Sequence, residues 1–439
     1  MNRKIEKLVR CMAFAWMLTS PVLPTFGQFK TYDKVFEFDS LGYAKVCNNY
    51  DKEEQLAGII DKSGREIVPM NYYDISVKNA EVAVVTQAGP EGPKGMQALF
   101  NLKSGKQITD FKYYYVKFDG KLGLGLAETE HGNIIIDSKG KNTKVGSFDD
   151  AQYLGDGFIL QQSGKNVKFY NLYGKLISDK IFKDVYHYDD WFVKPQNGWL
   201  QVWYPKDETH YESSYWLCND GTLLSDAEYM IKVECKDDNY VIVDDTEMNE
   251  KNLISTKDGS ILGAFKADAC WHSGDSVIVK KGKEYFIKNL KGEDVAKLDL
   301  SYLDSFSEDL AYAKDSQGKS CFVDRKGNKV IDYKGKEAGY PNYVGLGFFS
   351  EGLAPYREDR RKGFINKKGE VVIPAQFSEV YSFIDGHAVV RDFDDKYGMI
   401  DKNGNIVVPL EYKGCRNNTK DYAIVELQDG KETILKLAK

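Results

Sequence analysis

Short stretches of alternating apolar and polar residues recur along most of the chain, and each is followed by a turn that contains glycine. Residues 398–401 (GMID) form one such stretch, an Asp-x-x-Gly turn follows, and residues 406–408 (IVV) form the next. Alternation with a period of two predicts strands, and a short turn ending in glycine predicts a hairpin because glycine readily adopts positive φ. After residue 27 the pattern predicts no amphipathic helix, so we expect an all-β protein.

The hairpin pattern repeats about ten times, at an interval of about 35 residues. Residues 360–395 and 396–430 are near copies of one another, and residues 57–75 carry the same pattern. The turn glycines of the units are Gly64, Gly105, Gly140, Gly174, Gly221, Gly259, Gly292, Gly327, Gly369 and Gly404. A repeat of this length predicts an array in which each unit forms a small sheet that packs against its neighbours.

The C-terminal copies show the parts of a unit most clearly. Pro409 cannot donate a hydrogen bond to a neighbouring strand, so the returning strand is expected to end, or to form a sheet edge, at that position. A bulky aromatic residue such as Phe383 and a small-residue turn come next. Residues 386–390 (GHAVV) then predict a further strand.

These parts together resemble the WG repeat of bacterial envelope proteins. The family pattern is a Trp/Tyr-Gly pair, an I-D-x-x-G turn, V-I-P, an aromatic residue, and F-x-x-G-x-A-x-V. Tyr397 and Gly398 match the pair, whereas Gly363 and Gly58 follow a lysine and an alanine and keep only the glycine. The resemblance implies an all-β repeat architecture and brings no catalytic or cofactor residues with it.

The resemblance is clear at 57–85 and 319–430 and weak from 96 to 300. At the ends of the array, residues 32–46 resemble the second half of a unit and residues 431–435 resemble the first strand of one. Two such halves would complete each other in a ring, as in a β-propeller, although the units outnumber the usual four to eight blades. We therefore expect tandem hairpin repeats in a β-propeller-like array, with an open β-superhelix (solenoid) as the alternative.

Residues 1–27 have the features of a secretory signal peptide. A basic segment is followed by a short apolar run and then by Thr25 and Gly27, which are small enough for cleavage before Gln28. The apolar run before Pro21 is about ten residues, shorter than the roughly 20 that an uncleaved anchor would need. We expect residues 28–439 to form the repeat array without a transmembrane span, exported to the periplasm or cell surface of a Gram-negative bacterium.

Composition and motifs narrow the function. The formal net charge of −6 disfavours nucleic-acid binding. No metal-ligand spacing and no catalytic motif is present, and the acids of the Asp-x-x-Gly turns are explained by turn chemistry better than by Ca²⁺. We therefore expect no cofactor, no metal and no catalytic residues. The six cysteines after residue 27 permit disulfides, but their scattered spacing is more typical of small buried apolar residues.

Residues 187–216 depart from the repeat and contain four of the six tryptophans in the chain. Aromatic faces beside carboxylates are typical of sugar or peptide recognition, and insertions in repeat arrays often lie on the binding face. The candidate ligand-binding residues are Trp191, Trp199, Trp203, Tyr204 and Trp216. The alternative is that these rings fill core positions of an irregular unit. A second insertion, 336–352, is a weaker candidate of the same kind.

The sequence thus predicts an exported, non-catalytic repeat protein that binds or scaffolds an envelope protein or polysaccharide. Two other functions remain open. The chain could be a polysaccharide-acting hydrolase or lyase with its acids in the 187–216 region, or a purely structural spacer.

Overall fold

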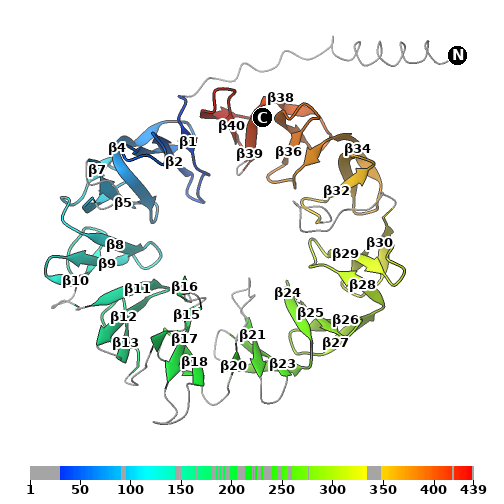
Figure 1. Cartoon of the computed structure of the whole chain (residues 1–439), viewed down its shortest axis with the longest axis horizontal. Coiled ribbons are helices and arrows are strands. Elements are labelled where there is room, and N and C mark those ends of the chain that lie inside the picture. The colour runs from blue at the N-terminus through cyan, green and yellow to red at the C-terminus, as the bar shows by residue number, and fades with distance from the viewer. Residues whose placement is uncertain are drawn as a thin grey trace.

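The chain forms small antiparallel sheets that stand side by side around a common centre, so that the whole array is a ring (Figure 1). The computed structural model describes residues 30–437, except for these internal segments: 90–94, 144–147, 149, 164–165, 179–183, 186, 189–190, 193–197, 205–212, 220, 222, 225–228, 231–239, 246–249, 256–259, 275, 334–347 and 418–419. Throughout the described residues the regular secondary structure is strand, which confirms the all-β prediction.

The first half of the ring contains a seven-stranded sheet followed by smaller ones. Its strands are β1 (Lys34–Val35), β2 (Tyr43–Asn48), β3 (Leu56–Asp61), β4 (Glu66–Val77), β5 (Val82–Gln87), β6 (Gln97–Asn101), β7 (Lys106–Gln107), β8 (Tyr115–Asp119), β9 (Leu124–Thr129), β10 (Gly132–Asp137), β11 (Ala151–Gly155), β12 (Phe158–Ser163), β13 (Asn166–Asn171), β14 (Asp184–Val185), β15 (His187–Tyr188), β16 (Trp191–Phe192), β17 (Trp199–Tyr204), β18 (Ser213–Cys218) and β19 (Leu223–Leu224).

The second half is more regular, with sheets of three or four strands. Its strands are β20 (Tyr229–Met230), β21 (Tyr240–Asp245), β22 (Glu250–Ser255), β23 (Ile261–Phe265), β24 (Ala269–Ser273), β25 (Ser276–Lys281), β26 (Glu284–Asn289), β27 (Asp294–Leu298), β28 (Leu300–Leu303), β29 (Leu310–Asp315), β30 (Ser320–Asp324), β31 (Lys329–Asp332), β32 (Leu353–Glu358), β33 (Arg361–Asn366), β34 (Val371–Phe377), β35 (Glu379–Val380), β36 (His387–Arg391), β37 (Tyr397–Asp401), β38 (Ile406–Tyr412), β39 (Gly414–Asn417), β40 (Tyr422–Glu426) and β41 (Glu432–Lys436).

The blade β35–β38 shows the complete unit, with each strand hydrogen-bonded to the next in chain order. The turns between the first and second strands and between the third and fourth strands lie on one side of the ring, here called the turn face. The hairpins between the second and third strands lie on the opposite side, the tip face.

In the Asp-x-x-Gly turn, the Asp401 carboxylate accepts hydrogen bonds from the amides of Asn403 (2.9 Å) and Asn405 (2.8 Å). Gly404 has a φ of 83°, as the turn pattern predicts.

The glycine of the Tyr-Gly pair faces a bulge in the strand beside it. Met399 pairs with Val408, but Tyr397 pairs with Tyr412, so β38 has two extra residues next to Pro409. A Cβ atom on Gly398 would lie 2.5 Å from the carbonyl oxygen of Val408. The same crowding occurs at Gly58 and Gly363, which explains why these units keep the glycine while the residue before it changes.

The apolar cores lie between neighbouring blades. One cluster combines Leu353 and Phe364 from the blade β32–β34 with Phe383, Ala388 and Ile400 from the next blade. Both faces of a blade are therefore covered by its neighbours, which is the packing of a propeller. Strand β4 continues from the fourth strand of one unit into the first strand of the next, so the first two units share one sheet.

Polar contacts on the turn face also join successive blades. The Ser350 hydroxyl donates to the Phe383 carbonyl (2.6 Å), and the Gly386 amide donates to the Glu351 carboxylate (2.9 Å). Lys402, from the Asp-x-x-Gly turn, forms an ion pair with Glu351 (2.8 Å). One blade earlier, Gly352 and Lys367 make the equivalent contacts to Glu308.

The two ends of the array meet and close the ring. Tyr32 and Glu432 exchange backbone hydrogen bonds of 2.9 and 2.8 Å, so the N-terminal segment lies beside the last strand, β41. The buried Glu432 carboxylate accepts hydrogen bonds from Arg416 (2.9 Å), Lys34 (3.0 Å) and the Val35 amide (2.8 Å). Residues of the first and last blades share one apolar cluster.

The propeller-like array predicted from the sequence is thus confirmed, and the units close into a ring although they outnumber usual propeller blades. Cys47, Cys321 and Cys415 are buried thiols, as expected for small apolar residues. The predicted signal peptide lies outside the described residues. Within the described part of the chain no helix is long and apolar enough to cross a membrane.

Replacing Gly398 by alanine should destabilise the fold, because the added methyl group would collide with backbone atoms of the bulge. We expect Gly398→Ala to lower the free energy of unfolding by about 1–3 kcal/mol, measured by denaturant titration. Gly414→Ala is the matched control, since its Cβ would meet only side-chain atoms of Glu426 at 3.1 Å or more. Equal stability of the two variants would contradict the proposed role of the bulge.

Replacing Glu432 by glutamine should weaken the closure. We expect a loss of about 3 kcal/mol, near the low end for breaking a buried ion pair, because the side chains of Arg416 and Lys34 stay 35% and 31% exposed. The exposed pair Lys297–Glu284 supplies the control variant Glu284→Gln, which should change stability by less than about 1 kcal/mol.

The stability difference between the wild type and Glu432→Gln should depend on pH, and its direction follows from the pKa of Glu432. Burial opposes ionisation of Glu432, but the hydrogen bonds from Arg416, Val35 and Lys34 outweigh it and lower the pKa of the carboxyl. The stabilisation is therefore complete above the unfolded pKa of about 4.3 and is lost as the pH falls through the lower folded pKa. The stability difference between the wild type and Glu432→Gln should shrink on acidification; an unchanged difference at pH 3 would refute the assignment.

Candidate functional site

The tryptophans singled out in the sequence lie on three strands. Trp191 is on β16, and Trp216 is on β18. Trp199, Trp203 and Tyr204 are on β17, which pairs with β18. The structure therefore brings four of these five residues into one sheet and places Trp191 in the separate hairpin β15–β16.

The register of this sheet divides the candidates between its two faces. Gln201 pairs with Trp216, so Trp216 occupies the same face as Trp199 and Trp203. Leu200 and Val202 alternate with them and are fully buried against the preceding blade. The side chains of the five candidates lie outside the described part of the structure. Of the second insertion, Tyr340 and Tyr343 lie outside the described residues, and Phe348 is half-buried.

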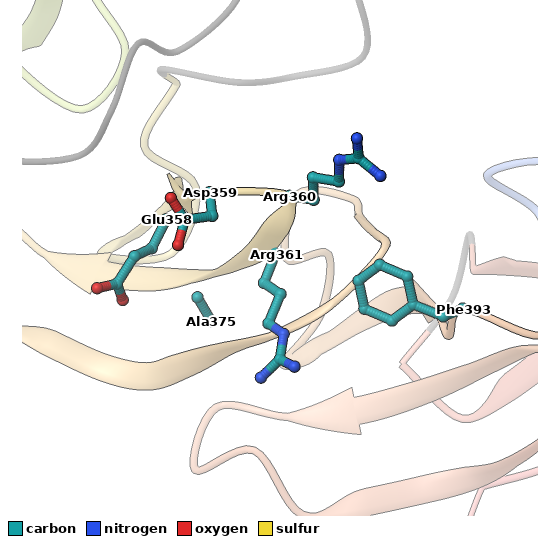
Figure 2. A pocket seen from close by; sticks show the side chains of 6 residues that line it. All are labelled: Glu358, Asp359, Arg360, Arg361, Ala375 and Phe393. Atoms are coloured by element: carbon teal, nitrogen blue, oxygen red, sulfur yellow. The ribbon is translucent and has the colours of Figure 1, made fainter.

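A separate hollow opens on the tip face, between the blades β32–β34 and β35–β38. It has a volume of about 580 Å³ and is lined by Glu358, Asp359, Arg360, Arg361, Ala375 and Phe393. The first four residues form the tight hairpin between β32 and β33, in which Glu358 pairs with Arg361 and Asp359 has a φ of 55°. In Figure 2, Glu358 and Arg361 flank Ala375, and Phe393 approaches from the neighbouring blade.

The floor of the hollow is a repeat position occupied by an unusually small side chain. Ala375 follows the proline of the V-I-P bulge, where the equivalent residues of other units are Met70 and Leu410. Those two larger side chains pack against the clusters between their blades. Ala375 likewise packs against the cluster shared with the preceding blade, which includes Tyr312 and Tyr356. Alanine at this position therefore leaves a smaller side chain beside the hollow than the other two units have.

The rim of the hollow is charged. Arg360, Arg361 and Glu358 are exposed, and none of the three forms an ion pair with a described residue. Phe393 is 56% exposed and lies in a turn that also contains three acids. Two guanidinium groups, a carboxylate and an aromatic ring thus face solvent around a single depression.

The support beneath the hollow is an ion-pair network that joins its two blades. Glu379, at the crossover between them, pairs with Lys362 beside the arginine hairpin and with Arg391 (3.7 Å) at the end of β36. Arg391 also pairs with Asp395 (3.0 Å) in the turn that carries Phe393. The two walls of the hollow are therefore held at a fixed spacing by a shared carboxylate.

The turn acids have structural partners instead of an open cation site. Burial opposes ionisation of Asp401, Asp324 and Asp61, but hydrogen bonds from their own turns outweigh it and lower the pKa of each carboxyl. This confirms the turn interpretation of these residues. Among the described residues, no group of three or more His, Cys, Asp or Glu side chains is placed to hold a metal.

Sequence reasoning missed the hollow, although two features of the sequence pointed to it. The chain has nine arginines, and Arg357, Arg360, Arg361 and Arg391 fall within 35 residues, whereas residues 66–324 contain none. The other signal, alanine in place of methionine or leucine after the V-I-P proline, becomes meaningful only once Phe393 is known to lie across from it.

Comparison with known proteins identifies the repeat. The sequence profile of the WG containing repeat matches residues 322–360, 363–397 and 397–431, which include the residues lining the hollow except Arg361. A search of curated proteins finds no match.

Solved structures with a similar arrangement are distant. They include a eukaryotic initiation factor, with 10% identity and a TM-score of 0.39 over 72% of this chain and 91% of the other. BamB from Moraxella catarrhalis has 12% identity and a TM-score of 0.25 over 94% and 100% of the two chains. The C-terminal WD40 domain of Sif2 has 11% identity and a TM-score of 0.29 over 65% and 94%.

Filling the hollow should leave the fold intact. We expect Ala375→Leu, which introduces the residue of the unit containing Leu410, to change the free energy of unfolding by less than about 1.5 kcal/mol, because the position is only half-buried and borders the hollow. Thermal unfolding measures the stability, and a crystal structure of the variant should show the depression filled. A loss comparable to that of Gly398→Ala would mean that the space is not available to a ligand either.

Proposed function

We propose that this WG repeat-containing protein is an exported, non-catalytic binding module that holds an envelope polysaccharide or protein on the tip face of its ring. The observation that carries the proposal is the hollow at Ala375, with exposed Arg360, Arg361 and Phe393 around it. Concave sites with a few convergent polar groups are the usual form of ligand sites. Export rests on the signal-peptide pattern of residues 1–27.

The fold suits a binding role better than a catalytic one. The ring rigidly connects one tip hairpin from each unit, and each hairpin can vary in sequence without disturbing the cores between the blades. The residues around the hollow include charged and aromatic groups but no histidine, cysteine or serine in their set. Ligand binding by Trp199, Trp203 and Trp216 stays a prediction from the sequence.

Retention of envelope material on the immobilised protein tests this function. We expect the wild type to retain a polysaccharide or protein from solubilised envelope, and Arg360→Ser/Arg361→Ser to retain about tenfold less, as expected when about 1.4 kcal/mol of binding free energy is lost. Ala375→Leu should have a similar effect because it occupies the hollow.

The matched control is Lys121→Ser/Lys139→Ser, which removes two exposed positive charges from turns of other units. It should retain as much material as the wild type. Equal retention by the arginine variant and the control would show that the hollow is not the binding site. If retention of envelope material falls only in the Trp199→Ala/Trp203→Ala variant, the binding site lies on the tryptophan sheet instead of at the hollow.

A further inference from the structure

We propose that the hollow binds a sugar acid, a uronate residue of an acidic polysaccharide, with its carboxylate on Arg361 and Arg360 and its ring against Phe393. This inference rests on the proposed binding function and adds the chemical class of the ligand. It is argued from three features of the hollow: its guanidinium groups, its carboxylates and its apolar wall.

The guanidinium groups favour a carboxylate. Arginine presents its N–H donors in a planar fork that matches the two oxygens of a carboxylate, and it binds this group with more directional specificity than lysine does. The chain otherwise relies on lysine for its positive charge, yet this hairpin contains two adjacent arginines. Neither Arg360 nor Arg361 is neutralised by a carboxylate among the described residues, so both can receive one from a ligand.

The acids of the hollow limit the charge density of the ligand. Glu358 and Asp359 lie on the same hairpin as the two arginines and line the same depression. They would repel a ligand with closely spaced negative charges, such as a multiply sulfated or phosphorylated chain. They would accept hydrogen bonds from neutral hydroxyl groups next to a single carboxylate. A uronate within a chain has one carboxylate on each sugar ring and free hydroxyls on other carbons of the same ring.

The remaining wall is apolar. The Phe393 ring is more than half exposed and faces the hollow from the neighbouring blade, with the methyl group of Ala375 at the floor (Figure 2). An aromatic ring has a negative face that attracts the weakly positive C–H bonds on the flat side of a sugar. The ring and the guanidinium groups lie around one depression, so a single sugar unit can contact both.

This compactness favours a sugar acid over an acidic peptide. A uronate carries its carboxylate, its hydroxyl donors and its C–H face within one residue, whereas a peptide needs separate residues for the acidic and the apolar contact. Extended peptides also commonly bind by adding a strand to a sheet edge. The arginine pair lies instead at a hairpin tip, where Glu358 and Arg361 are already paired with each other.

Calorimetric titration of the purified chain with defined oligosaccharides tests the ligand class. The probes are tetragalacturonate and tetramannuronate, the same oligomers after reduction of their carboxyl groups to alcohols, and a tetra-aspartate peptide. We expect at least one uronate to bind at least about tenfold more tightly than its reduced counterpart. Arg361→Lys should weaken that uronate by about tenfold although it keeps the charge, because the planar fork is lost.

Two further variants locate the contacts. Phe393→Leu keeps an apolar group but removes the ring, and should weaken the uronate and its reduced counterpart by the same factor, since both have the C–H face. Lys121→Ser/Lys139→Ser should bind like the wild type. Each variant is compared only if its thermal unfolding temperature matches that of the wild type. Ala375→Leu places a larger side chain at the hollow and should also weaken uronate binding, although it leaves both arginines in place.

The outcomes separate this inference from the function on which it rests. If no uronate binds, or if a reduced oligomer or the peptide binds as tightly, the ligand class is wrong. The binding function still stands in that case, provided that envelope retention depends on Arg360, Arg361 and Ala375. If envelope retention does not depend on them, the proposed function fails at this site, and uronate binding in solution would not rescue it.

Discussion

The contact between Glu432 and the N-terminal segment determines whether the rest of the array can be stable. The apolar clusters of the described residues lie between neighbouring units, so an open array would leave the cluster shared by the first and last blades half exposed. Glu432 is 3% exposed, and the free-energy cost of desolvating its carboxylate is offset by hydrogen bonds from Arg416, Lys34 and the Val35 amide. Because the contacts join residues about 400 positions apart, they depend on the whole ring and do not form within one unit.

The two sides of the ring have different constraints. On the turn face, Glu351 and its equivalents bind the next blade through a backbone amide and a lysine, so sequence changes there would disturb the stacking of blades. On the tip face, the hairpins project beyond the interblade cores. Ion pairs such as those of Glu379 with Lys362 and Arg391 join neighbouring hairpins at their bases. Variation is therefore tolerated at the tips, which is where the arginine hairpin and Phe393 occur.

The sequence was sufficient for the repeat and for the two half-units at its ends, because both depend on local patterns. Closure depends on contacts between residues about 400 positions apart, so the sequence left a ring and an open superhelix as alternatives. Positive φ at Gly404 and the bulge at Pro409 follow from residue types a few positions apart. The hollow depends on Arg361 and Phe393 from different blades, and a repeat pattern gives no spacing between blades. For the tryptophan candidates, the sequence predicted the face of the strand but not its role. The period-two pattern places Trp199 and Trp203 on one face, in agreement with the observed register. A face of a blade can serve either as core or as surface, and the pattern does not distinguish the two.

The hollow also shows how one unit of a uniform array acquires a separate role. If Ala375 were the methionine or leucine of other units, its side chain would contribute more to interblade packing. The unit gives up that packing energy, which for a large-to-small change at a buried site is about 2–5 kcal/mol and at this half-buried position is less. The two arginines beside this position are exposed and serve no described ion pair within the blade. A unit that gives up interblade packing next to two such arginines is easier to explain by ligand binding than by the stability of the ring.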